Sequence, residues 1–245
     1  MAFAAWSSAT AKSDKLLVFM QKEAWTWTTP RLPQAARLVR WGHFGAPVLI
    51  FPTAGGDFEE IERFHLIDAL GDLIDRGRMK VYSVDGLATR AWLSARAPEQ
   101  ECKRFQESYD SFLYEDVLAR IRADCRDPKI EPILMGASRG ASTALTTLFR
   151  HPDSFRAAIS ISGIYDPAPS LKGLTAPRLE RLRQRLIILG SGEGDYERPA
   201  DSRALSETLA AQNVPSRLSL WGRERDHSWS TWRDLSPRLL AQAAL

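Results

Sequence analysis

The chain is 245 residues long, and 33 Lys and Arg against 30 Asp and Glu give a formal net charge of +3. Hydrophobic residues make up 44% and charged residues 26%, a composition that excludes a disordered or collagen-like chain. Basic and acidic residues are interleaved, with no Lys- or Arg-rich block, so we do not expect nucleic acid as the main ligand.

Cysteine content and apolar runs narrow the class of protein further. Cys102 and Cys125 cannot form a disulfide framework for a chain of this size, and neither lies in a cluster of metal ligands. The apolar runs are far shorter than the roughly 20 residues of a membrane span. The N-terminus lacks the pattern of a signal peptide. We expect a cytoplasmic protein that binds no membrane, with residues 1–19 as a partly disordered extension and residues 20–245 as a single domain.

Short apolar runs alternate with longer amphipathic stretches along most of the chain. Two extended segments come first, at 23–29 and 37–41, and are expected to join the sheet as antiparallel edge strands. Further strands are predicted at 47–51, 79–84, 132–135, 155–161, 185–189 and 216–221. Helices are predicted at 57–76, 105–125, 141–150, 200–212 and 229–243. This alternation predicts an α/β fold with a mostly parallel sheet covered by helices on both faces.

One motif in this frame points to chemistry. Gly136-Ala137-Ser138-Arg139-Gly140 matches the pattern G-x-S-x-G, directly after an apolar strand and directly before a helix. In a nucleophile elbow the serine occupies a strained turn, and side chains at the glycine positions would collide with neighbouring backbone. The position between strand and helix favours Ser138 as a nucleophile over an inert serine in a glycine-lined turn.

A nucleophilic serine needs a base, and the chain has four histidines. His65 is expected inside an amphipathic helix, His43 in a turn, and His151 as a helix cap. His227 lies in a loop between the last strand and the last helix, where the base of a Ser…acid…His order belongs. We therefore predict His227 as the general base.

The acid that orients the imidazole is expected after the strand at 185–189. That loop offers Glu193, Asp195 and Glu197. Asp195 is favoured because a short side chain in a glycine-rich turn has little freedom. Glu193 and Glu197 remain alternatives, and Asp226 is expected to be a loop residue that points elsewhere.

Two backbone N–H groups are needed to stabilise a tetrahedral oxyanion. One is expected from Arg139, the residue after the nucleophile. The other is expected from Ala54 or Gly55, in the Pro52–Asp57 loop, where two glycines let the backbone approach a substrate.

The motifs together resemble the α/β-hydrolase superfamily, and within it the esterase branch related to esterase D (S-formylglutathione hydrolase). The matching segments are 51–57 (FPTAGGD), 84–86 (VDG), 136–140 (GASRG), 151–153 (HPD), 160–163 (SISG), 192–195 (GEGD) and 226–232 (DHSWSTW). The GEGD match supports Asp195 as the acid. In similar proteins the segment between Gly163 and Arg185 is longer, so the resemblance implies a reduced cap here.

The resulting hypothesis is a serine esterase that cleaves a small-molecule ester or thioester through Ser138, His227 and Asp195. This chemistry needs no metal and no cofactor. Trp92, Trp229 and Trp232 are candidates for the wall of the substrate pocket, with packing in the core as the alternative. The Arg139 side chain is a candidate for binding an anionic group of the substrate, with a surface ion pair as the alternative. An acyltransferase with the same triad and a catalytically silent binding scaffold are the alternatives. Assembly into a homo-oligomer stays open.

Overall fold

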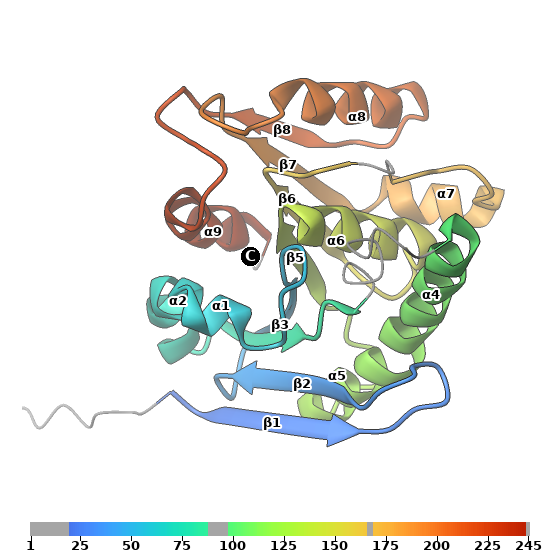
Figure 1. Ribbon diagram of the computed structural model, residues 1–245, viewed down its shortest axis with the longest axis vertical. Coiled ribbons are helices and arrows are strands. Elements are labelled where there is room, and N and C mark those ends of the chain that lie inside the picture. Colours follow the sequence, from blue (N-terminus) through green and yellow to red (C-terminus); the bar gives the residue numbers. More distant parts are fainter. Residues whose placement is uncertain (1–19, 88–97, 166–168, 244–245) are drawn as a thin grey trace, which may run out of the picture.

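The computed structural model describes residues 20–87, 98–165 and 169–243 (Figure 1). Eight strands in these ranges form one sheet in the order β1-β2-β4-β3-β5-β6-β7-β8. Their bounds are β1 Lys22–Trp27, β2 Ala36–Trp41, β3 Ala46–Phe51, β4 Met79–Val84, β5 Ile133–Ala137, β6 Ala157–Ile161, β7 Leu186–Ser191 and β8 Arg217–Leu220. β1 pairs with β2, and β2 pairs with β4, in antiparallel orientation. Every pairing among β3 to β8 is parallel. The predicted mostly parallel α/β sheet with antiparallel N-terminal edge strands is confirmed.

Helices cover both faces of this sheet (Figure 1). Their bounds are α1 Glu60–Arg63, α2 Leu66–Asp75, α4 Glu99–Phe112, the π-helical segment η1 Leu113–Val117, α5 Leu118–Cys125, α6 Arg139–Arg150, α7 Ala176–Arg183, α8 Pro199–Ala211 and α9 Trp229–Ala243. α7 lies in the short segment after β6, and it is a helix that the sequence pattern did not predict. No helix in the described ranges is long and apolar enough to cross a bilayer.

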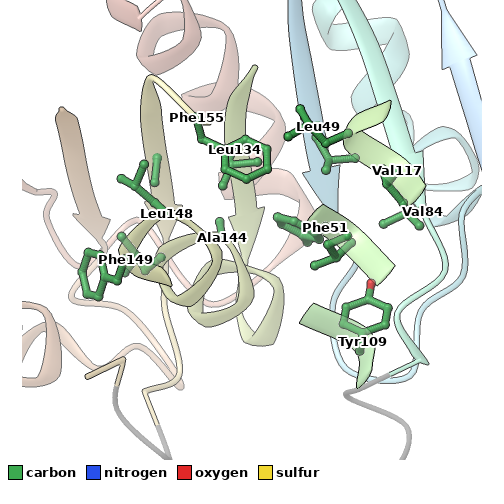
Figure 2. Packing of buried hydrophobic residues seen from close by; sticks show 14 of the residues in the cluster. Leu49, Phe51, Val84, Tyr109, Val117, Leu134, Ala144, Leu148, Phe149 and Phe155 are labelled. Carbon is green, nitrogen blue, oxygen red and sulfur yellow. The ribbon is translucent and has the colours of Figure 1, made fainter. Parts of the chain in front are cut away.

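The core consists of two apolar layers, one on each side of the sheet. On one side, buried side chains of α1, α2 and α9 pack against the strands. On the other side, residues of α4, η1, α5, α6, α7 and α8 form the second cluster. Figure 2 shows part of this second cluster, with Leu49 and Phe51 of β3, Leu134 of β5 and Ala144 and Leu148 of α6. Alternate side chains of the strands β2 to β7 thus enter opposite layers, as the pleat requires.

The helix predicted over 57–76 is interrupted. His65 has a left-handed backbone (φ 61°), which ends α1 and starts α2. Its side chain is 70% exposed and its Nδ1 lies 2.7 Å from Asp68 Oδ2. The expectation that His65 lies inside a continuous amphipathic helix is therefore wrong. The break brings Phe64, the residue before it, to a position where it stacks on Trp229 of α9.

Candidate active site

Ser138 lies in the turn between β5 and α6, at the end of the parallel strands. Its backbone has φ 55° and ψ −122°, a conformation that is strained for a non-glycine residue. A Cβ at Gly136 would lie 2.2 Å from the carbonyl carbon of Gly140, and a Cβ at Gly140 would lie 2.5 Å from the Phe51 carbonyl oxygen. Both glycines of the motif are therefore required by close backbone contacts, which supports the reading of this turn as an elbow.

His227 reaches Ser138 from the loop that follows β8. Its Nε2 lies 3.0 Å from Ser138 Oγ, although the two residues are 89 positions apart in the chain. The imidazole is mostly buried, and its ring meets the Trp232 ring edge-on at 5.1 Å between centroids. A serine hydroxyl and an imidazole in this geometry can exchange a proton.

Glu197 is the carboxylate beside the imidazole. Its Oε1 lies 3.9 Å from His227 Nδ1, and its side chain is fully buried. Asp195 is exposed, and its backbone carbonyl accepts the His227 N–H at 3.0 Å. Glu193 is exposed and lies 3.5 Å from Arg203. Of the three acids in the loop, Glu197 is thus placed to act on the imidazole, and Asp195 contributes its backbone.

Two serine hydroxyls orient the Glu197 carboxylate. Ser162 Oγ donates to Oε1, and Ser191 Oγ donates to Oε2 at 3.0 Å. Ser162 follows β6 with a left-handed backbone (φ 50°), and Ser191 ends β7. Neither serine was predicted from the sequence as part of the site. The sequence did contain a signal for these two residues: each is a polar residue at the end of a strand, and the two strands are adjacent and parallel. The ends of such strands lie at the same edge of the sheet as the elbow.

The charges around His227 act on its basicity in opposite directions. Burial lowers its pKa below the ordinary histidine value, Glu197 raises it, and the nearby Arg198 guanidinium lowers it. The net shift is downward. The imidazole is therefore neutral, and able to accept a proton, over a wider range of pH than an exposed histidine.

The acid loop and the histidine loop are joined through their backbones. Gly194 N donates to the Arg225 carbonyl at 2.9 Å, and Asp195 accepts from His227 N. A Cβ at Gly192 would lie 2.0 Å from the Arg225 carbonyl oxygen. The glycines of this loop therefore permit a contact between two backbone segments that places the acid and the imidazole together.

The oxyanion candidates lie on either side of the elbow. Arg139 is the first residue of α6, so its N–H belongs to the N-terminal turn of that helix. The Pro52–Asp57 loop follows β3 and passes over Gly140, with Ala54 exposed and Gly55 at φ 74°. Arg139 directly follows Ser138 in the chain, and the backbone carbonyls of Phe51 and Pro52, at the start of the loop, lie close to Gly140 of the elbow.

The three tryptophan candidates differ in their burial and in their neighbours. Trp232 is buried, with its indole N–H unpartnered among the described residues, and contacts His227. Trp229 is half-buried between Trp232 and Phe64, and it stacks on the Phe64 ring at 4.8 Å. Trp92 lies outside the described residues. An aromatic row thus runs from the imidazole toward the surface, and Phe64 in it was not anticipated.

Two other residues considered in the sequence, His151 and Asp226, form structural contacts. His151 caps α6 and its Nε2 lies 2.9 Å from Asp110 Oδ2. Asp226 accepts from the hydroxyls of Ser228 and Thr231 at the start of α9. Among the residues with described positions, no three His, Cys, Asp or Glu side chains are grouped to hold a metal ion.

A mostly parallel sheet with a serine elbow after β5 and a histidine after β8 defines the α/β-hydrolase fold. Similar solved structures include a ferulic acid esterase (16% identity, 92% of this chain and 98% of that chain covered, TM-score 0.71). An S-formylglutathione hydrolase from Agrobacterium tumefaciens is 14% identical, with 92% and 95% covered and a TM-score of 0.65. One from Staphylococcus aureus is 14% identical, with 93% and 97% covered and a TM-score of 0.63.

The family is established by sequence. Residues 59–244 match the family model described as "Putative esterase". The chain therefore belongs to this esterase family, and it is a carboxylic ester hydrolase, as the resemblance in the sequence implied. No curated protein matches the chain.

Proposed function

We propose that the chain hydrolyses carboxylic esters or thioesters through an acyl-enzyme formed on Ser138. The observation that carries the proposal is the 3.0 Å contact between His227 Nε2 and Ser138 Oγ, with the buried Glu197 carboxylate on the other side of the same imidazole. A nucleophile, a base and an orienting acid in this order are what acyl transfer requires.

The reaction has two halves. His227 takes the Ser138 hydroxyl proton while Oγ attacks the substrate carbonyl carbon, and the carbonyl oxygen becomes the oxyanion. When this intermediate collapses, the bond to the alcohol or thiol breaks and His227 gives its proton to that leaving group. Water then attacks the acyl-enzyme with His227 as base. The carboxylic acid product is released as His227 returns the proton to Ser138.

Glu197 takes the role of the acid in this proposal, in place of the favoured Asp195. Its carboxylate is nearer to Nδ1, is buried, and is held by Ser162 and Ser191. A buried carboxylate stabilises the imidazolium that forms when the proton moves, and it favours the tautomer with the proton on Nδ1.

The oxyanion is proposed to accept from Arg139 N–H and from a backbone N–H of the Pro52–Asp57 loop, at Ala54 or Gly55. The first group points from the start of a helix, where the helix dipole favours negative charge. The second is supported by the packing of this loop on the elbow at Gly140.

Ser138→Ala tests the proposal directly. The variant should lose at least about 10³-fold in kcat on p-nitrophenyl acetate, with an unchanged circular dichroism spectrum and no labelling by a fluorophosphonate. Retained turnover would reject the mechanism. Adding an alcohol acceptor to the wild-type protein separates hydrolysis from acyl transfer, because a transferase would direct most of the acyl group to the acceptor.

A further inference from the structure

A buried glutamate lies beneath the loop from which the second oxyanion donor is proposed to come. Glu60 is the first residue of α1, and it is 6% exposed. Its Oε2 accepts the Thr53 backbone N–H at 2.7 Å, and its Oε1 accepts the Thr53 hydroxyl at 2.7 Å. Both carboxylate oxygens are thus directed to one residue of the loop.

Gly56 provides the space for this carboxylate. A Cβ at Gly56 would lie 2.5 Å from Glu60 Oε1 and 2.6 Å from Oε2. The Gly56 carbonyl accepts the Gly86 N–H at 3.2 Å, and its N–H donates to the Thr53 carbonyl at 3.2 Å. The Thr53–Gly56 turn is therefore held by Glu60 at its start and by the backbone after β4 at its end.

This arrangement removes one N–H group of the loop from those that could face a substrate. Thr53 N–H is directed to Glu60, so it does not serve the oxyanion. The next two residues, Ala54 and Gly55, form the tip of the turn, and Ala54 is exposed. We propose that Glu60 is a positioning residue that holds Thr53 so that the N–H groups of Ala54 or Gly55 face the oxyanion; this rests on the proposed function.

The chemistry of the contact fits a carboxylate. Two donors from Thr53 meet two acceptor oxygens, which satisfies a charged group that burial would otherwise destabilise. Burial raises the pKa of Glu60, and the hydroxyl and the N–H of Thr53 act against that rise. A group that touches no substrate and fixes a backbone donor is expected to change kcat more than KM, since the oxyanion forms only in the transition state.

The experiment compares Glu60→Ala, Glu60→Gln and the matched control Glu59→Gln. Glu59 directly precedes α1, and its carboxylate binds Lys22. Turnover of p-nitrophenyl acetate is measured per active site titrated with a fluorophosphonate. Inhibition by a trifluoromethyl ketone is measured in parallel, because addition of Ser138 Oγ to this ketone creates an oxyanion in the proposed hole.

We expect Glu60→Ala to lower kcat about 10–100-fold, to change KM less than about threefold, and to weaken the trifluoromethyl ketone by the same factor as kcat. Glu60→Gln should recover most of the loss, because its amide oxygen accepts from Thr53 N–H and its amide nitrogen can donate to the Thr53 hydroxyl. Glu59→Gln should match the wild type. A kcat per active site within about threefold of wild type in Glu60→Ala would overturn the proposal, whatever its melting temperature.

Two further variants apply if Glu60→Ala does not fold. Thr53→Val removes the hydroxyl donor and keeps the N–H, and Gly56→Ala pushes the carboxylate away without removing it. Both should lower kcat and trifluoromethyl ketone affinity together, and wild-type values in both would overturn the proposal. If Ser138→Ala is as active as the wild type, the proposed function fails and the role of Glu60 fails with it; if only the Glu60, Thr53 and Gly56 variants are unaffected, the role of Glu60 alone fails.

Discussion

The two sides of the candidate site are fixed by different physical means. On the nucleophile side, backbone contacts set the geometry: Gly136 and Gly140 allow approaches that no side chain would permit. On the acid side, the Glu197 carboxylate accepts from the hydroxyls of Ser162, which follows β6, and Ser191, which ends β7. The first constraint is steric and is carried by the glycines of one short motif. The second is polar and needs Ser162, which is 35 positions from Glu197 in the chain. The first can be recognised from five consecutive letters, and the second cannot.

The largest expected difference separates the two acids of the loop. Glu197→Gln should lower kcat by about 10²–10⁴-fold, because the amide cannot stabilise the imidazolium and can favour the wrong tautomer. Asp195→Asn should stay within about twofold of wild type, because Asp195 is exposed and contributes its carbonyl. Steady-state kinetics on p-nitrophenyl acetate measures both. The reverse order of effects would return the role of the acid to Asp195.

A steric substitution tests the nucleophile side. Gly136→Ala should destabilise the fold by at least about 1–3 kcal/mol, because its Cβ would meet backbone atoms of Gly140 and Ala141. Gly71→Ala is the matched control: Gly71 lies inside α2, and a Cβ there would meet only Met20 Cε, at 4.0 Å, so the same change should stabilise by about 0.5–1 kcal/mol. Denaturant unfolding measures both free energies. Equal effects of the two substitutions would contradict the steric account.

Removing one hydroxyl from the acid side should have a smaller effect than removing the acid. Ser191→Ala and Ser162→Ala should each lower kcat about tenfold, because Glu197 keeps one of its two hydroxyl donors and is less well oriented. The double variant should approach Glu197→Gln. If the double variant kept wild-type kcat, the hydroxyls would have no part in placing the carboxylate.

The smallest expected effect is a shift in pH dependence. Only the neutral imidazole can take the Ser138 proton, so kcat/KM falls as the pH drops through the pKa of His227. The Arg198 guanidinium lowers that pKa, so Arg198→Gln should raise it and move the acid limb of kcat/KM to higher pH. Arg203→Gln, in the helix α8 that begins directly after Arg198, removes an arginine paired with Glu193; it is the control and should leave the limb in place. A limb that moved to lower pH in Arg198→Gln would contradict the charge assignment.

The sequence predicted the features that depend on local pattern. The parallel strands are recognisable because they are buried on both sides and read as continuous apolar runs such as 47–51. The placement of Ser138 and His227 followed from the order of elements, since parallel strands end at one edge of the sheet. The break at His65 was missed because a single left-handed residue leaves the hydrophobic spacing around it intact.

The places of Glu197 and Glu60 depend on side-chain contacts that the hydrophobic pattern does not reveal. Glu197 was considered and ranked below Asp195, because side-chain length was weighed without the hydroxyls of Ser162 and Ser191 that receive the longer side chain. Glu60 gave no signal, since a glutamate near the start of a helix is ordinarily exposed. Its burial depends on the space at Gly56, four positions earlier.

The backbone contacts at Arg225 have a consequence for protein engineering and for divergence within the family. Since the loop after β7 rests on the loop after β8 through Gly192 and Gly194, neither can be lengthened or replaced independently. A graft that alters the specificity of this enzyme would have to transplant both loops as one unit. Natural variation in one of them should be accompanied by compensating variation in the other.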